Sequence, residues 1–237
     1  MIFTQDRRIE YSQLSPDKTV SIPELFRFLQ DMAVTQTTAS GYSLERLCEM
    51  NRAWILLSTH LVINKPIFYP SNIEIQTWTF DFSKVAGPRA FVIRDKTSGE
   101  EYASACSMWT FIDTESGRPT LIPENMITEF GNGAPSSVSY LRRSPDFDTT
   151  EVVGEYQIMK RDLDSNYHVN NTKYIEYALE AVADTKRIRE VEIFYRKPVF
   201  LGEKIFLFRS FDINGDILVS IKTQDNDTCT YVRFVVE

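Results

Sequence analysis

The sequence predicts an α+β fold in which one long helix and an antiparallel sheet occur twice. The first observation is an internal repeat: positions 65–75 read KPIFYPSNIEI and positions 197–207 read KPVFLGEKIFL. Lysine-proline, a β-branched residue, phenylalanine and two later apolar positions recur at the same spacing. The second observation is that a helix-like pattern and then strand-like runs occur in each half of the chain. Together they indicate a duplicated unit.

In the first half, the expected helix begins after Ser21 and ends near Gly41. The stretch SIPE at 21–24 is a capping-box start with proline in the first turn. Leu25 and Leu29 continue an apolar stripe at helical spacing. Strands are then expected at 54–64, 72–83, 89–95 and 101–113, with a hairpin turn at Ser98-Gly99.

The second half is expected to open with a strand at 152–161, followed by a polar stretch. Its helix begins near Asn170 or Asn171, since both are good helix caps, and its apolar stripe runs to Val182. Further strands are expected at 190–196, 204–212, 216–223 and 228–236, with a hairpin turn at Asn214-Gly215.

The middle of the chain interrupts this regular pattern. The stretch 117–145 holds seven of the nineteen glycines and prolines (nine plus ten), a composition typical of a linker. We therefore predict an N-terminal domain over 1–125, a linker over 126–148 and a C-terminal domain over 149–237. A long helix wrapped by a curved antiparallel sheet is the hotdog arrangement, so two copies predict a tandem, or double, hotdog.

Composition excludes several classes of protein. The net charge of −7 argues against general nucleic-acid binding, and no apolar run approaches the ~20 residues of a membrane helix. Three cysteines without a CxxC spacing indicate reduced thiols and a cytoplasmic protein. His60 and His168 are far apart and have no nearby cysteine ligands, so a metal site is not expected.

The stretch DLDSNYHVNN, at 162–171, concentrates polar side chains directly before the second helix. If it is extended, Asp164, Asn166 and His168 point to one side, and Asp162 shares that side. A carboxylate, an amide and an imidazole placed together can perform general acid–base chemistry on a carbonyl compound. The unpaired N–H groups of the helix start would stabilise an oxyanion. The alternative interpretation is a plain Asx-rich turn with a helix cap.

The stretch RDLDSNYHVNNTKYIEYALE, at 161–180, closely resembles the signature of the acyl-acyl-carrier-protein thioesterases. Weaker similarity covers nearly the whole chain, including YRKPVF at 195–200. The resemblance implies Asp164, Asn166 and His168 as the catalytic set, acyl carrier protein as the partner, and no metal or organic cofactor. The D-x-N-x-H pattern is also similar to that of single-hotdog acyl-CoA thioesterases, whereas the doubled length favours the carrier-protein branch.

One departure from the family pattern affects the expected mechanism. Plant members carry a Glu-Cys pair where this chain has Pro198-Val199, and none of the three cysteines occupies that place. A cysteine nucleophile is therefore not expected. Two routes remain, attack by water on the thioester and attack by the Asp164 carboxylate through an anhydride, and we favour water.

The first half lacks a D-x-N-x-H motif before its helix, which predicts one active site per chain and an acyl-binding role for this half. Residues that would line an acyl tunnel are Phe26, Phe28, Met32, Trp54, Trp78 and Trp109. Basic residues that would dock the acidic carrier are Arg142, Arg143, Lys186, Arg187 and Arg189. An acyl-CoA thioesterase and a non-catalytic acyl-binding module stay open as alternatives, as does the choice between a monomer and a homodimer.

Overall fold

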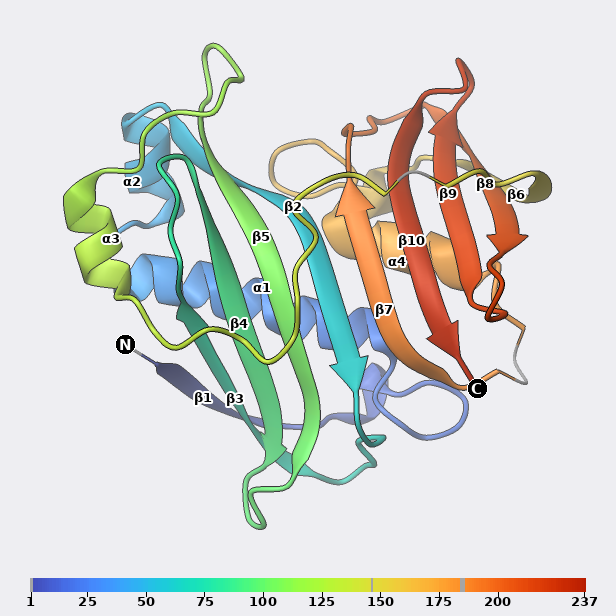
Figure 1. The fold of residues 1–237 in the computed structure, drawn as a ribbon, viewed down its shortest axis with the longest axis horizontal. Coiled ribbons are helices and arrows are strands. Elements are labelled where there is room, and N and C mark those ends of the chain that lie inside the picture. The colour runs from blue at the N-terminus through green and yellow to red at the C-terminus, as the bar shows by residue number, and fades with distance from the viewer. Residues whose placement is uncertain (1, 146, 184–185) are drawn as a thin grey trace. The chain divides into compact units, whose positions relative to one another are not determined.

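The structure, a computed structural model, describes residues 2–145, 147–183 and 186–237 (Figure 1). It divides the chain into two compact units, Met1–Tyr140 and Leu141–Glu237. In the described residues, each unit holds an antiparallel sheet of five strands with a helix against one face. Within the same residues, no helix has the length and the apolar character needed to cross a membrane.

The first unit packs α1 (Ile22–Ala39) along one face of its sheet. Its strands lie in the order β1-β3-β4-β5-β2. The buried side of α1 includes Phe28 and Met32, and the facing core includes Ile73 and Ile75; none of the four is exposed to solvent. The remaining elements are β1 (Phe3–Arg8), α2 (Leu44–Glu49), β2 (Arg52–Ile63), β3 (Asn72–Thr79), β4 (Ala86–Asp95), β5 (Glu101–Asp113) and α3 (Glu124–Phe130).

The second unit repeats this topology around α4 (Asn171–Leu179). Its strand order is β6-β8-β9-β10-β7, which matches the first unit strand for strand. The strands are β6 (Glu151–Gln157), β7 (Ile188–Tyr195), β8 (Lys204–Phe211), β9 (Ile217–Thr223) and β10 (Thr228–Val236). Both predicted helices and all nine predicted strands are present, so the predicted tandem hotdog is confirmed.

Five short elements were not predicted: β1, α2, α3 and two 3-10 helices, η1 (Tyr11–Gln13) and η2 (Lys160–Asp162). β1 pairs with one neighbouring strand, β3, and alternates half-buried and exposed residues. Because none of its residues is fully buried, its sequence FTQDRR has few apolar residues by which a strand could be predicted. α2 and α3 have six and seven residues, too few for a clear helical period. Two predicted bounds were too long: the strand that we expected to reach Arg161 ends at Gln157, and α4 ends at Leu179 rather than Val182.

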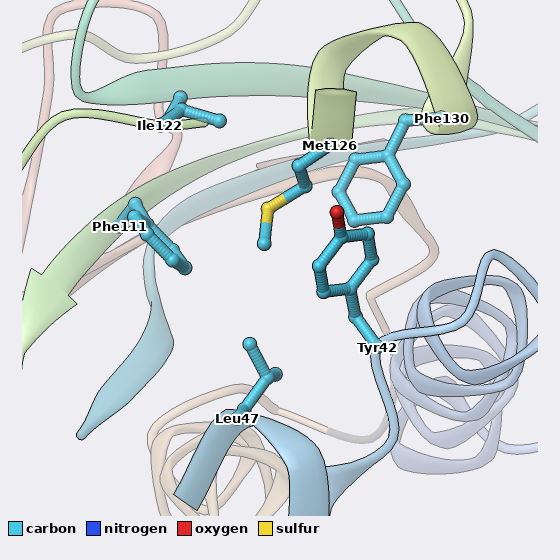
Figure 2. Close-up of a cluster of buried hydrophobic side chains, with 6 residues drawn as sticks. All are labelled: Tyr42, Leu47, Phe111, Ile122, Met126 and Phe130. Atoms are coloured by element: carbon cyan, nitrogen blue, oxygen red, sulfur yellow. The ribbon is translucent and has the colours of Figure 1, made fainter. Parts of the chain in front are cut away.

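A buried apolar cluster closes one end of the first unit (Figure 2). It joins α2, α3 and β5 through Tyr42, Leu47, Phe111, Ile122, Met126 and Phe130. Met126 and Phe130 are at most 1% exposed, so the predicted linker over 126–148 begins inside a packed helix of the first unit. The other predicted domain bounds stay a prediction, and residue 146 of that linker lies outside the described residues.

Residues 131–140, here called the strap, cross the face of the first sheet opposite α1 (Figure 1). Val138 packs on Phe80, Ala90 and Cys106. The indole N–H of Trp78 donates to the carbonyl of Ala134 at 2.7 Å. The expectation that Trp78 lines the same tunnel as Phe28 is therefore wrong, because Trp78 lies on the strap side of the sheet.

His60 has a structural place on β2, as its strand position suggested. Its Nδ1 lies 3.1 Å from the carbonyl oxygen of Ser139 in the strap. The imidazole thus fixes the strap to the outer face of the sheet, and it is 7% exposed.

Gly133 allows the strap to approach Trp78 closely. A Cβ at this position would lie 2.4 Å from Cδ1 of Trp78, whose ring is held by its hydrogen bond to Ala134. We predict that Gly133→Ala lowers the free energy of unfolding by about 1–3 kcal/mol through overpacking, measured by urea denaturation. Ala134→Ser, at an exposed neighbouring position, is the control. Equal stability of Gly133→Ala and Ala134→Ser would contradict the close approach of Gly133 to the Trp78 ring.

Candidate active site

The polar stretch folds into a tight turn, residues 164–168, which we call the DxNxH turn. The N–H of Asp164 donates to the carbonyl of His168 at 2.8 Å, and the N–H of Tyr167 donates to the carbonyl of Asp164 at 3.2 Å. Tyr167 has a φ of 61°, in the left-handed region that reverses the chain. The predicted extended strand is therefore wrong here, and alternation does not place the three side chains on one side.

Asp164 closes this turn through one carboxylate oxygen. Its Oδ1 accepts from the N–H of Asn166 at 2.8 Å and from the N–H of His168 at 3.3 Å. This is the Asx pattern by which aspartate satisfies the backbone of its own turn. Within the described residues, Oδ2 makes no hydrogen bond to the protein, so it stays available to a ligand or water.

The imidazole of His168 lies against Phe200 rather than against the carboxylate. The two ring centroids are 4.9 Å apart at an interplanar angle of 82°, and the two backbones form a β-bridge. In the described part of the chain, no hydrogen bond joins two of the side chains of Asp164, Asn166 and His168. The turn gathers the three residues within five positions, and the hydrogen bonds that link them run from backbone N–H groups to the Asp164 carboxylate or to backbone carbonyls.

Phe200 is a site residue that the sequence analysis missed. The repeat singled out Phe68 and Phe200 as matching positions, but only as a sign of duplication. The same repeat could have placed Phe200 beside the turn, because the repeat fixes where β8, the strand after Phe200, begins. Asn166, by contrast, is exposed and contacts the turn through its backbone N–H.

The start of α4 is partly occupied by its own cap. The side-chain oxygen of Asn170 accepts from the N–H of Thr172 at 3.0 Å, and its carbonyl accepts from the N–H of Lys173 at 2.8 Å. Two of the helix N–H groups that we expected to face a ligand are therefore taken. The N–H of Asn171 has no acceptor among the described residues and is the one left at this helix start.

Asp162 is buried and binds backbone groups on either side of the turn. Its side chain does not join those of Asp164, Asn166 and His168, although the sequence analysis expected it to. It is 5% exposed, and its Oδ2 accepts from the N–H of Met159 at 2.8 Å. Its carbonyl accepts from the N–H of Asn170 at 2.8 Å, which ties the turn to the helix cap. Burial, together with the nearby Asp162 carboxylate, raises the pKa of Tyr177 on α4.

Comparison with known proteins assigns the chain to a family. The family model described as acyl-ACP thioesterase N-terminal domain matches residues 1–130, and the model of the C-terminal domain matches residues 147–232. The chain belongs to the acyl-ACP thioesterase family. The DxNxH turn and α4 both lie within the C-terminal match.

Curated relatives of this chain include plant proteins. It is 25% identical over 214 residues to the palmitoyl-acyl carrier protein thioesterase of Arabidopsis thaliana, which is named as chloroplastic. That match covers 83% of this chain and 52% of the plant protein. The chain thus spans about half the length of the curated relatives it matches.

Solved structures of thioesterases share the fold of this chain over its full length. An acyl-ACP thioesterase from Bacteroides thetaiotaomicron superposes with a TM-score of 0.90 at 21% identity, covering 100% of this chain and 98% of that one. The 12:0-ACP thioesterase from Umbellularia californica gives a TM-score of 0.84 at 19% identity, covering 100% and 97%. At such identities the likeness shows the fold alone.

The first unit of the chain contains a backbone counterpart of the DxNxH turn, although the sequence analysis found none. Residues 15–19, SPDKT, have the same backbone: Ser15 donates to the carbonyl of Thr19, and Lys18 has a φ of 66°. Thr19 bridges Phe68 as His168 bridges Phe200. The expectation that the first half lacks this element is therefore wrong for the backbone and right for the D-x-N-x-H side chains.

The two buried cysteines, Cys106 and Cys229, do not offer a nucleophile. Burial raises the pKa of Cys106 to about 12 and that of Cys229 to about 11, so both thiols stay protonated at neutral pH. At the position of the plant Glu-Cys pair, Val199 is fully buried. Its N–H donates to the hydroxyl of Tyr174 at 3.1 Å, so this segment serves packing.

The neighbouring residues Asn170 and Asn171 allow a matched test of the helix start. Asn170→Ala removes the cap of Thr172, so we predict a loss of about 1 kcal/mol in the free energy of unfolding. Asn171→Ala leaves that cap in place and is predicted to be neutral within error. Urea denaturation of both variants measures the difference, and an equal loss for both would show that Asn170 is not the cap in solution.

Proposed function

We propose that this chain hydrolyses fatty acyl thioesters of acyl carrier protein, giving the free fatty acid and the holo carrier. The observation that supports this most is the DxNxH turn, with an available carboxylate oxygen and an imidazole directly before α4. Family models that together match residues 1–130 and 147–232 support the same reaction class. Asp164, Asn166 and His168 are the proposed catalytic residues.

In the proposed first step, water attacks the thioester carbonyl carbon. Oδ2 of Asp164 and the imidazole of His168 position this water, and His168 takes the proton that it loses. The contact of the ring with Phe200 limits its rotation, so the nitrogen that accepts the proton keeps one direction. Asp164 is a less suitable nucleophile, because the two backbone N–H groups at Oδ1 stabilise the negative charge of the carboxylate and so make Oδ2 less nucleophilic.

The negative charge that develops on the carbonyl oxygen needs hydrogen-bond donors. The side-chain amide of Asn166 and the N–H of Asn171 are the donors that the turn and the helix start leave available. The tetrahedral intermediate then collapses, and the carbon–sulfur bond breaks. The proton held by His168 passes to the leaving sulfur, which restores the imidazole and releases the carrier thiol.

The acidic carrier requires a basic docking surface. Arg142, Arg143, Lys186 and Arg187 are exposed side chains of the second unit and are proposed for this contact. Arg189 is also proposed for this contact, and its guanidinium donates to Glu237 at 2.7 Å. A cytoplasmic location and the absence of a cofactor stay predictions from the sequence, and so does the open choice between a monomer and a homodimer.

His168→Ala tests the proposed activity. We predict a loss of about a hundredfold or more in thiol release from acyl carrier protein substrates, with unchanged thermal unfolding. Thr19→Ala, the change at the matching position of the first unit, is predicted to keep full activity. Colorimetric detection of the released thiol is the measurement, with acyl-carrier and acyl-CoA donors of equal chain length compared side by side.

The outcomes of that assay separate the candidate functions. Faster release from acyl-CoA would favour an acyl-CoA thioesterase of hotdog type over the carrier-protein enzyme. No thiol release from any donor would favour an acyl-binding module without catalysis. Equal losses for His168→Ala and Thr19→Ala would remove His168 from the catalytic set.

The route of attack is tested by single turnover in water labelled with heavy oxygen. Direct attack predicts label in the released fatty acid and none in the Asp164 side chain. An anhydride opened by water at the aspartyl carbon would place label in Asp164. Mass spectrometry of the peptide that contains the DxNxH turn is the measurement, and label at Asp164 above that of unreacted protein would overturn direct attack.

A further inference from the structure

One row of residues in the first unit is polar although it lies in the helix–sheet core. The row crosses four neighbouring strands, and its members are paired in register. None of them is more than 4% exposed. We call this set the polar row: Thr79 on β3, Arg89 on β4, Ser107 on β5 and Thr59 on β2.

The polar row faces α1. The guanidinium of Arg89 donates through Nη1 to the side-chain oxygen of Gln36, a buried residue of α1. Residues paired directly across neighbouring strands point to the same face of a sheet, so the other three members share the face of Arg89. The row therefore lies on the side of the sheet that faces α1, although the hydroxyl of Thr79, at the end of β3, donates to the carbonyl of Gly131 at the start of the strap, at 2.9 Å.

The matching row of the second unit is apolar throughout. The repeat aligns β3 with β8, and the strand register then carries the alignment across the sheet. The corresponding residues are Phe211, Ile217, Phe234 and Val191. Ile217, which takes the place of Arg89, is 3% exposed. Phe234 and Val191 are fully buried, whereas Phe211 is 58% exposed. Since one copy of the fold fills three of these four positions with buried hydrocarbon, the fold itself does not require polar side chains there.

The charge of Arg89 has no counter-ion in the described residues. Besides Gln36, its one other acceptor there is the hydroxyl of Thr77, at 3.4 Å. A guanidinium has five N–H donors, so most of them lack an acceptor. Burial lowers the pKa of Arg89 to about 9, so it still carries its charge at neutral pH. Other arginines that reach into the fold are paired, as Arg233 is with Asp216 at 2.6 Å.

A second donor on the same face also lacks an acceptor. The indole N–H of Trp54 is buried and has no hydrogen-bond partner in the described residues. Trp54 pairs with Phe111, four positions along β5 from Ser107, so its side chain lies on the α1 side of the sheet. Unpaired buried donors cost free energy, and an oxygen acceptor supplied from outside the chain would offset that cost.

We propose that the first unit binds an acyl chain that carries an oxygen group beyond the thioester, with Arg89 as the residue that recognises this oxygen. A plain hydrocarbon chain would leave the guanidinium unpaired. A hydroxyl oxygen would accept from it, and a carboxylate would also neutralise its charge and accept two parallel hydrogen bonds. This inference rests on the proposed function, because the ligand class is an acyl chain of the substrate or product.

Binding of three free acids of equal carbon number to the full chain tests this inference. The probes are dodecanoic acid, ω-hydroxydodecanoic acid and dodecanedioic acid, each below its micellar concentration, measured by isothermal titration calorimetry. We expect one or both oxygenated acids to bind about tenfold or more tightly than dodecanoic acid, as expected for hydrogen bonds to a charged donor. Equal affinities for all three, or no binding of any, would overturn the inference.

Two variants separate recognition from a structural role. Arg89→Ile installs the residue of the matching second-unit position and is expected to abolish the preference. Gln36→Glu keeps the shape of the side chain and provides Arg89 with an internal carboxylate. It is expected to raise the thermal midpoint and to reduce the preference for oxygenated acids about tenfold. If Arg89 only anchors α1, Gln36→Glu would leave the preference unchanged, and that result would overturn the inference.

The test is independent of catalysis. Thiol release from plain acyl donors by a chain that shows no preference for oxygenated acids would overturn this inference and leave the proposed hydrolysis standing. A clear preference for oxygenated acids in a chain that releases no thiol would support this inference and contradict the proposed hydrolysis.

Discussion

The loop before each helix depends on a carboxylate oxygen that accepts backbone N–H groups of its own turn. A five-residue turn with a left-handed residue cannot pair all of its N–H groups with neighbouring strands, so a side chain must supply the acceptor. In the second unit, Asp164 does this from the first position of the turn. In the first unit, Asp17 does it from the third position.

The position of that aspartate decides what each turn can offer a ligand. Oδ1 of Asp17 also accepts from the hydroxyls of Ser15 and Thr19, at 2.6 Å and 2.8 Å, so this turn is closed on itself. The second-unit turn has no hydroxyl at the matching places. Oδ2 of Asp164, the Asn166 amide and the imidazole ring therefore stay available. The two turns share a backbone, and the side chains set which one suits chemistry.

The fold was predictable from the sequence because its long elements have clear periods and its repeat fixes the topology. β1 was missed since an edge strand with one half-buried face resembles a polar loop. The identities of the site residues were also predictable, but their geometry was not. An Asx-rich run has the same composition when extended and when turned, and a positive φ at Tyr167 has no signal in a non-glycine residue.

The face of the sheet on which a residue lies was also not predictable from the sequence. Trp78 and Phe28 are both large and aromatic, but only the return of the strap across the sheet reveals that they lie on opposite faces. Arg89 is the converse case, since an arginine within a strand is usually read as exposed. Its buried position emerges only when register places it between Thr79 and Ser107, opposite Gln36.

Duplication explains how one chain tolerates polar groups in two costly places. In the second unit, three residues of the matching row, Ile217, Phe234 and Val191, are buried and apolar and supply ordinary hydrophobic stability, so its turn can leave polar groups unsatisfied. In the first unit, the turn is internally bonded, and the unpaired donors lie instead at Arg89 of the polar row and at Trp54. Each unit thus satisfies the polar groups of one of these two regions, the turn or the core row. In the other region it leaves polar groups unpaired, which folding alone would not favour. Because both copies share one topology, the fold alone does not account for either departure, and this contrast is the basis on which we propose ligand binding at both places.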